Sequence, residues 1–234
     1  MVLYYDILFL GDWMKIKALF KKYWGYILAF TITLVVISVL FYLQGVSPFG
    51  EKSLLTIDFF HQYGPMMGEL FDRIKNHSGL LYSFSMSMGL PFYRNFFNYL
   101  SSPFNILMLL FSHRELLTSF SVIIGVKLGF STLFMYLFLK EKIRLSNVIT
   151  LCFSLAYSFS AYFSAYYWNI MWLDGMVFLP LIVYGLERMI IKRKPLVYII
   201  GLSIMMFANY FIAYMICIFL VIYFIILLIQ YNDK

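Results

Sequence analysis

Long apolar runs alternate with short polar segments along the chain. The first run, from Tyr23 to Leu43, has about 20 residues, which is enough for one helix to cross a membrane. Similar runs extend from Ser119 to Leu139, from Val148 to about Trp168, and from Met176 to about Ile191. The pattern predicts four membrane-spanning helices in these positions.

The last apolar run is too long for one crossing. It extends from Leu196 to Ile229, and a helix of roughly 34 residues would measure about 50 Å against a hydrocarbon core of about 30 Å. Either one long tilted helix or two short spans satisfies this length. We favour two spans that turn near Asn209-Tyr210. The predicted fold is therefore all-α, a polytopic membrane helix bundle of about six spans.

The composition supports an integral membrane protein. Of the 234 residues, 63% are hydrophobic and 12% are charged, and the mean hydropathy is +0.84. A soluble domain needs far more charge to cover its surface. The net charge of +7 comes from short basic clusters between apolar runs rather than from a basic folded surface. We therefore expect membrane lipids, and not nucleic acid, as surroundings and partners.

The basic clusters predict the orientation. One cluster precedes the first span, a second lies between spans two and three, and a third lies between spans four and five: Lys15, Lys17, Lys21, Lys22; Lys140, Lys142, Arg144; Arg188, Lys192, Arg193, Lys194. These clusters alternate with poorly basic connections, and basic loops stay in the cytoplasm. The rule makes residues 1–22 a cytoplasmic basic N-terminus and the C-terminus cytoplasmic. The long loop 44–118 and the connection 169–175 are then extracytoplasmic.

The start of the chain allows two interpretations. Residues 1–13 are apolar but carry Asp6 and Asp12, whereas Met14 opens a more typical basic start. Both Met1 and Met14 remain candidate start residues. No small-residue cleavage site follows the first apolar run, so we predict an uncleaved anchor.

The first outer segment predicts an interfacial helix. Apolar residues recur every three to four positions from Asp58 to Lys75, and Pro65 interrupts the pattern early. Asp58 stands near the start of this helix, and Gln62 follows one turn later on the same face. Asp58 is either an N-cap that accepts a backbone N–H or a catalytic base.

Turn-forming residues dominate the next stretch, from Ser85 to Asn105. Aromatic and amide side chains surround one arginine, Arg94, with Asn98 and Tyr99 close in sequence. Aromatic faces and amides suit a sugar ring, and a guanidinium suits a phosphate. The alternative is ordinary packing at the membrane interface. A short re-entrant or interfacial helix is expected from Phe104 to Phe111.

Polar residues inside or beside the spans are the remaining candidates. Lys127 lies in the middle of span two, where a charge is costly, so it should face a cavity or a carboxylate. Binding of an anionic lipid carrier and an internal salt bridge both remain open. Asp174, beside Trp172, is either a second active-site carboxylate or a helix cap. Asn209 and Tyr210 are expected at the outer turn between spans five and six.

These motifs occur in an order that resembles the YfhO family of bacterial membrane proteins. They comprise Asp58, Gln62 and Tyr63 after span one, then Gly89, Tyr99-Leu-Ser-Ser-Pro103, Trp172-Leu-Asp174 and Asn209-Tyr210. The resemblance covers nearly the whole chain after Met14. YfhO-like proteins in turn resemble the GT-C superfamily of glycosyltransferases, which use polyprenyl-phosphate sugars as donors on the outer face of the membrane. The resemblance implies a GT-C-like fold, with Asp58 as the catalytic base.

The resemblance also implies partners and roles. The acceptor would be a cell-envelope glycopolymer, lipoteichoic or wall teichoic acid in a Gram-positive envelope. Arg94 or Lys127 would stabilise the departing lipid phosphate, and Asp174 would orient the acceptor or bind a divalent metal, whose requirement stays open. The predicted substrate-binding residues are Gln62, Tyr63, Arg94, Asn98, Tyr99, Lys127, Trp172, Asp174, Asn209 and Tyr210.

Two other functions remain open. One is a flippase or transporter of a lipid-linked sugar, which predicts charged groups along a route through the bilayer. The other is an inactive truncated fragment, because YfhO-like proteins are normally several times longer. Residues 23–234 then represent the N-terminal transmembrane module of such a protein.

Overall fold

The computed structural model describes residues 2–86 and 88–232, with side chains for 23–86 and 88–231. The side chains of the predicted basic N-terminus, and the choice between Met1 and Met14, lie outside this description. The helices of the bundle are α1 (Val2–Gln44), α4 (Leu116–Lys142), α5 (Asn147–Ser158), α6 (Ala161–Tyr166), α7 (Leu173–Lys192), α8 (Leu196–Ala208) and α9 (Tyr210–Asn232). The all-α prediction is confirmed for the described residues.

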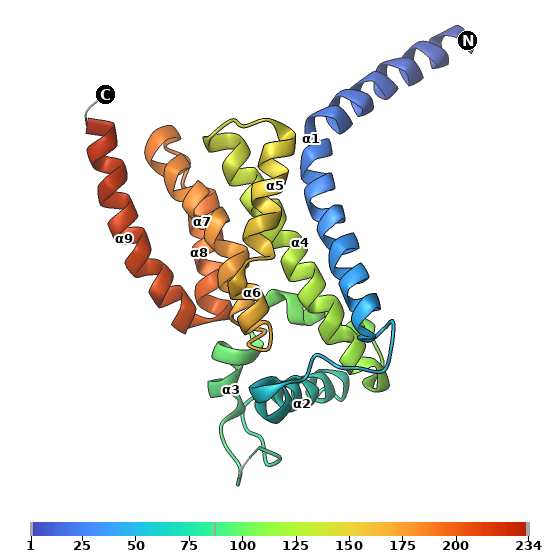
Figure 1. Ribbon diagram of the computed structural model, residues 1–234, viewed down its shortest axis with the longest axis vertical. Helices are drawn as coiled ribbons and strands as arrows, with labels where there is room; N and C mark the ends of the chain where they lie inside the picture. The colour runs from blue at the N-terminus through green and yellow to red at the C-terminus, as the bar shows by residue number, and fades with distance from the viewer. Residues whose placement is uncertain (1, 87, 233–234) are drawn as a thin grey trace.

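The helices run back and forth between two ends of the bundle (Figure 1). In the described part of the chain, four segments are long and apolar enough to cross a membrane: Tyr23–Gln44, His113–Lys142, Asn147–Tyr166 and Tyr210–Tyr231. Helix α8 is apolar but shorter, and α7 is as long as a span but carries charged residues at both ends. With α5 and α6 as one pass, the arrangement gives the predicted six passes.

The predicted division of the last apolar run is confirmed. Asn209 has an extended backbone (φ −157°, ψ 100°) between α8 and α9. Its side-chain Oδ1 accepts a hydrogen bond from Ile212 N at 2.9 Å, which caps the start of α9. The asparagine therefore ends one helix and begins the next, and the two helices pack against each other.

The predicted third span is not one continuous helix. It breaks at Phe159–Ser160, where Ser160 is extended (φ −66°, ψ 167°), and α6 begins after it. Serine competes with helix hydrogen bonding, and Ser158, Phe159 and Ser160 occur in succession here. The hydroxyl of Ser158 bonds to Ser131 of α4 at 3.0 Å.

Helix α4 lies at the centre of the bundle and packs against α1, α5 and α7. A chain of hydroxyl groups joins three of these helices. Thr33 of α1 donates to Thr132 of α4 at 2.8 Å, and Thr132 lies 2.9 Å from the Ser158 hydroxyl of α5. In a membrane, where burial of apolar surface does not drive helix association, such hydrogen bonds contribute roughly 0.6–2 kcal/mol each.

Helices α7 and α8 approach closely at Gly185. A Cβ atom at this position would lie 2.5 Å from the backbone N of Tyr198 and 2.7 Å from its Cα. We expect Gly185→Ala to destabilise the protein by about 1–3 kcal/mol, because a backbone cannot move aside as a flexible side chain can. Thermal unfolding in detergent measures this effect.

Gly68→Ala is the matched control, because a Cβ at Gly68 of α2 meets nothing within 4 Å. This substitution removes a helical glycine and should be neutral or stabilising by up to about 1 kcal/mol. Equal stability of the Gly185→Ala variant and the wild type would contradict the close packing of α7 and α8.

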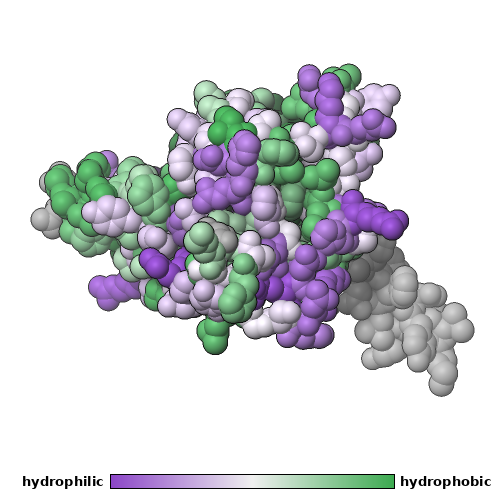
Figure 2. Space-filling view, turned by 90° about the horizontal axis from the view of Figure 1, so that it is seen from below, coloured by the Kyte–Doolittle hydropathy of each residue, from purple (hydrophilic) through white to green (hydrophobic). Residues whose placement is uncertain are grey.

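The segment between α1 and α4 forms a layer across one end of the bundle (Figure 1). It contains a π-helical turn η1 (Phe59–Tyr63), α2 (Gly64–Lys75), α3 (Phe92–Asn95), a second π-helical turn η2 (Phe96–Leu100), and the 3₁₀ helices η3 (Pro103–Leu110) and η4 (His113–Glu115). Figure 2 shows this end of the molecule, with hydrophilic side chains among hydrophobic ones. The basic connections α4–α5 and α7–α8 lie at the opposite end.

Two details of this layer differ from the sequence prediction. The predicted amphipathic helix is not α-helical throughout, because its first turn, η1, is π-helical and continues into α2 at Gly64, directly before Pro65. The stretch from Phe92 to Leu100 was predicted as turns, whereas it forms α3 and η2. Burial of Phe92 and Leu100 in the core favours helical turns there. The short helix predicted from Phe104 to Phe111 is present as η3.

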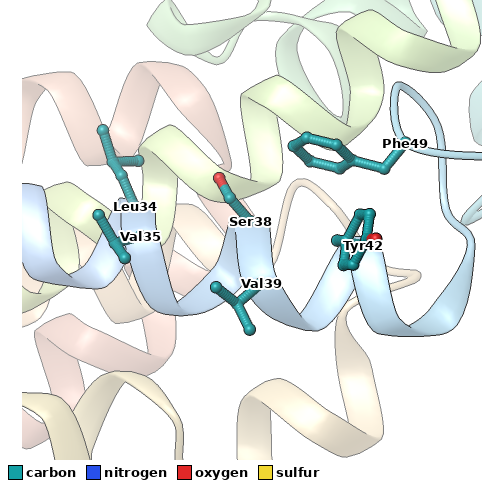
Figure 3. Close-up of a pocket in the computed structure, with 6 residues that line it drawn as sticks. All are labelled: Leu34, Val35, Ser38, Val39, Tyr42 and Phe49. Atoms are coloured by element: carbon teal, nitrogen blue, oxygen red, sulfur yellow. The ribbon is translucent and has the colours of Figure 1, made fainter.

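The outer face of α1 carries an apolar groove of about 410 Å³ (Figure 3). Five residues of the helix and Phe49 of the following loop line it: Leu34, Val35, Ser38, Val39, Tyr42 and Phe49. The Tyr42 and Phe49 rings meet edge to face with centroids 6.2 Å apart. The groove contains no charged side chain, so it belongs to the lipid-facing surface of the bundle.

Candidate functional site

Two π-helical turns meet in the outer layer. The rings of Tyr63, in η1, and Tyr99, in η2, stack with centroids 5.6 Å apart and an interplanar angle of 24°. π-Helical turns are rare and occur often at functional sites. The stack joins two segments of the outer layer, although Tyr63 and Tyr99 are 36 positions apart in the sequence.

Asp58 directly precedes the first of these turns. Its carboxylate makes no capping hydrogen bond to the turn, so the N-cap interpretation is wrong. The preceding residue, Ile57, has φ +50°, in the left-handed region that β-branched residues avoid. Such strain costs about 1–3 kcal/mol and clusters at functional sites. Asp58 is half-buried, and helix capping does not explain the presence of a carboxylate at this position.

Tyr63 lies next to Asp58. Its pKa is raised to about 12, chiefly by burial and further by the neighbouring Asp58 carboxylate and by Tyr99. A negative charge on the phenol would be buried and would face a carboxylate, so the neutral form is favoured. The Tyr63 hydroxyl therefore keeps its proton at neutral pH and is available as a hydrogen-bond donor beside Asp58.

The raised pKa of Tyr63 predicts an alkaline loss of stability. Because the pKa of Tyr63 is higher in the folded state than in the unfolded state, its contribution is fully present below about pH 10. It is lost as pH rises toward about 12. Unfolding temperatures of wild type and Tyr63→Phe should differ by a constant amount up to about pH 10 and converge above it. A constant difference through pH 12 would contradict the raised pKa.

Other predicted binding residues lie in η1, α3 and η2 of the outer layer and at the α8–α9 turn. Asn98 is half-buried, and its Oδ1 atom has no hydrogen-bond partner among the described residues. Its carbonyl oxygen accepts a 3.0 Å hydrogen bond from Asn209 Nδ2. Gln62 is half-buried, Arg94 is exposed, and Tyr210 is exposed at the first position of α9. The Asn98–Asn209 bond fixes η2 against the α8–α9 turn.

Lys127 and Asp174 form a buried ion pair beneath this layer. Lys127 Nζ lies 3.0 Å from Asp174 Oδ1 and donates 2.7 Å to the carbonyl oxygen of Ile170. Ser102 donates to Asp174 Oδ1 at 3.0 Å. The side chains of Lys127 and Asp174 are 1% and 0% exposed. The carboxylate partner predicted for the mid-span lysine is present, and it belongs to another helix of the same chain.

This burial separates the ion pair from the surface residues. Substrate contact with Lys127 or Asp174 would require a rearrangement that opens the pair. Trp172, two residues before Asp174, is half-buried and packs on Tyr166 with ring centroids 5.6 Å apart. The structure thus unites Asp58, Tyr63 and Tyr99 in the outer layer, with Asp58 and Tyr99 partly exposed and Tyr63 buried, and places Lys127 and Asp174 inside the bundle.

Several serine contacts were not predicted from the sequence. Ser101 donates 2.6 Å to the carbonyl oxygen of Phe207 at the end of α8, and Ser102 binds Asp174. These two residues of Tyr99-Leu-Ser-Ser-Pro103 attach η2 and η3 to α8 and α7. The signal was present in the motif, but a serine pair before proline also suits an ordinary turn.

Glu69 of α2 accepts hydrogen bonds from the loop that follows this helix, and this role was not predicted from the sequence. Burial would raise the pKa of its carboxyl, but hydrogen bonds from Ser85, Arg73 and Ser83 outweigh burial and lower it. Arg73 Nε lies 2.7 Å from Glu69 Oε1. Among the described residues, no cluster of three or more His, Cys, Asp or Glu side chains has the arrangement of a metal site.

Residues 29–234 match the family model described as bacterial membrane protein YfhO. The chain belongs to the YfhO family. No curated protein and no solved structure matches the chain. The match covers the C-terminal part of α1 and every later element, including both π-helical turns of this YfhO-family member.

Proposed function

We propose that this YfhO-family protein transfers a sugar from a polyprenyl phosphate to a cell-envelope glycopolymer such as teichoic acid. The observation that carries the proposal is the environment of Asp58. Its carboxylate is uncapped, follows a strained residue and lies beside a neutral Tyr63 hydroxyl. The resemblance to GT-C glycosyltransferases supports the same carboxylate as the base.

The proposed reaction is a direct displacement. The acceptor hydroxyl oxygen attacks the anomeric carbon of the donor sugar while Asp58 takes the hydroxyl proton. The bond between that carbon and the phosphate oxygen breaks, and polyprenyl phosphate leaves with the bonding electrons. Exposed Arg94 lies on the same layer and is suited to stabilise the leaving phosphate.

The aromatic and amide residues are suited to bind the sugar. Tyr99, stacked on the buried Tyr63 ring, and Asn98 are both partly exposed, so an aromatic ring and an amide side chain of η2 are suited to contact a sugar. The site lies at the end of the bundle opposite the basic connections. By the positive-inside rule, that end is extracytoplasmic, where a polymer acceptor is located.

The alternative function is transport of the lipid-linked sugar. A transporter needs polar groups along a route through the membrane. The ammonium group of the central candidate, Lys127, is already paired with Asp174 and with the Ile170 carbonyl oxygen. This pairing inside the protein favours sugar transfer at the surface over passage of the lipid-linked sugar through the bundle.

A reconstitution experiment distinguishes the two functions. The full-length protein in liposomes receives a polyprenyl-phosphate sugar with a labelled sugar, together with purified teichoic acid. Transfer predicts label in the polymer and release of unlabelled polyprenyl phosphate. Movement of the labelled lipid between leaflets, without label in the polymer, would overturn the proposal and support transport.

A further inference from the structure

A polar cavity lies at the opposite end of the bundle from Asp58. It measures about 790 Å³ and lies between α1, α4, α5 and α7. Its lining combines tyrosines with charged and amide side chains: Tyr23, Gly25, Tyr26, Tyr136, Leu137, Lys140, Glu141, Asn147, Tyr184 and Arg188. A neighbouring cavity of about 350 Å³ shares Glu141, Tyr184 and Arg188 with it.

The charge around the two cavities is mainly positive. Their linings contain five basic side chains, Lys140, Lys142, Arg144, Arg188 and Lys192, and two acidic ones, Glu141 and Glu187. Glu187 is already neutralised, since Lys142 lies 2.7 Å away and the Tyr223 hydroxyl donates to it. The excess positive charge therefore favours an anion.

Arg188 has an unused donor at the boundary of both cavities. Its Nε atom is buried and has no hydrogen-bond partner among the described residues. Its guanidinium carbon lies 5.5 Å from the centre of the Tyr184 ring. A buried donor without an acceptor is unfavourable, so a bound oxyanion would stabilise this arginine.

The location favours a membrane lipid over a soluble anion. Trp24 and Ile27, on α1 beside the lining residues, are 46% and 44% exposed on a membrane-spanning segment. Tyrosines gather in the cavity lining, and this residue is typical of the headgroup level. Basic pockets between helices on the cytoplasmic side bind anionic headgroups. We propose that this cavity binds the phosphate headgroup of an anionic phospholipid, with Arg188 as its principal ligand.

The test uses the full-length protein in phosphatidylcholine vesicles with and without phosphatidylglycerol. Native mass spectrometry measures the phosphatidylglycerol that stays bound, and a titration gives its apparent affinity. We expect Arg188→Gln to weaken binding roughly tenfold or more, as expected for loss of a hydrogen bond to a charged group. Lys194→Gln, which removes one charge at the same end but outside the cavity lining, should leave binding unchanged.

Three results would overturn the proposal. The first is equal weakening by Arg188→Gln and Lys194→Gln, which indicates general surface attraction. The second is wild-type protein that retains phosphatidylcholine as well as phosphatidylglycerol, a result independent of any variant. The third is displacement of phosphatidylglycerol by inorganic phosphate at equal concentration, which indicates a site for free anions.

Discussion

Asp58→Asn in the full-length protein is expected to lower sugar transfer by about 10²–10⁴-fold, the usual contribution of a general base. The amide keeps the size of the side chain but cannot take the acceptor proton. The fold should persist, because Asp58 makes no capping bond and the asparagine carbonyl can still accept the hydrogen bond that the Tyr63 hydroxyl makes to Asp58. Glycosylation of teichoic acid in cells that carry only the variant gives the measurement.

Asp72→Asn is the matched control for this experiment. Asp72 is a carboxylate of the same outer layer, and its contact is a partly exposed one with His113, 3.4 Å away. The Asp72→Asn variant should retain teichoic acid glycosylation, whereas the Asp58→Asn variant should not. Wild-type glycosylation by the Asp58→Asn variant would remove Asp58 from the mechanism.

Lys127→Met is expected to destabilise the protein by about 3–5 kcal/mol. The substitution leaves the Asp174 carboxylate in the core with only Ser102 as a side-chain partner, and an uncompensated buried charge is costly. Thermal unfolding and the yield of folded protein in detergent measure the loss. Unfolding of the variant at the wild-type temperature would show that the pair contributes little.

The double variant Lys127→Met/Asp174→Asn separates structure from substrate binding. It removes both charges, so most of the lost stability should return. If the pair is structural, the double variant also retains transfer within a few-fold of wild type. A folded double variant without transfer would instead assign Lys127 or Asp174 to the substrate, as the sequence alone allowed.

The spans could be predicted because hydropathy is a local property. Each apolar run is helical over most of its length, and the amide of Asn209 marked the only strongly polar position near the middle of the last run. The break at Phe159–Ser160 was missed because short serine-containing stretches also occur inside intact membrane helices, where the hydroxyl bonds to the preceding turn. Ser154, for example, donates to the Thr150 carbonyl within α5.

The candidate site was predictable only in part. Asp58 could be singled out as a carboxylate near the start of a helix, and the family resemblance gave it a role. The stack of Tyr63 on Tyr99 and the pairing of Lys127 with Asp174 join residues far apart in sequence, so no periodic pattern contains them. The π-helical turns and the positive φ of Ile57 depend on tertiary packing and have no sequence signature here.

The central claim is that Asp58 performs the chemical step of sugar transfer and does not merely support the fold or the donor site. A single-turnover assay with purified full-length protein tests it most directly, with labelled donor bound first and acceptor polymer added second. The account predicts that Asp58→Asn binds the donor as wild type does but forms no labelled polymer on the wild-type time scale. Labelled polymer formed by the variant at the wild-type rate would contradict the account.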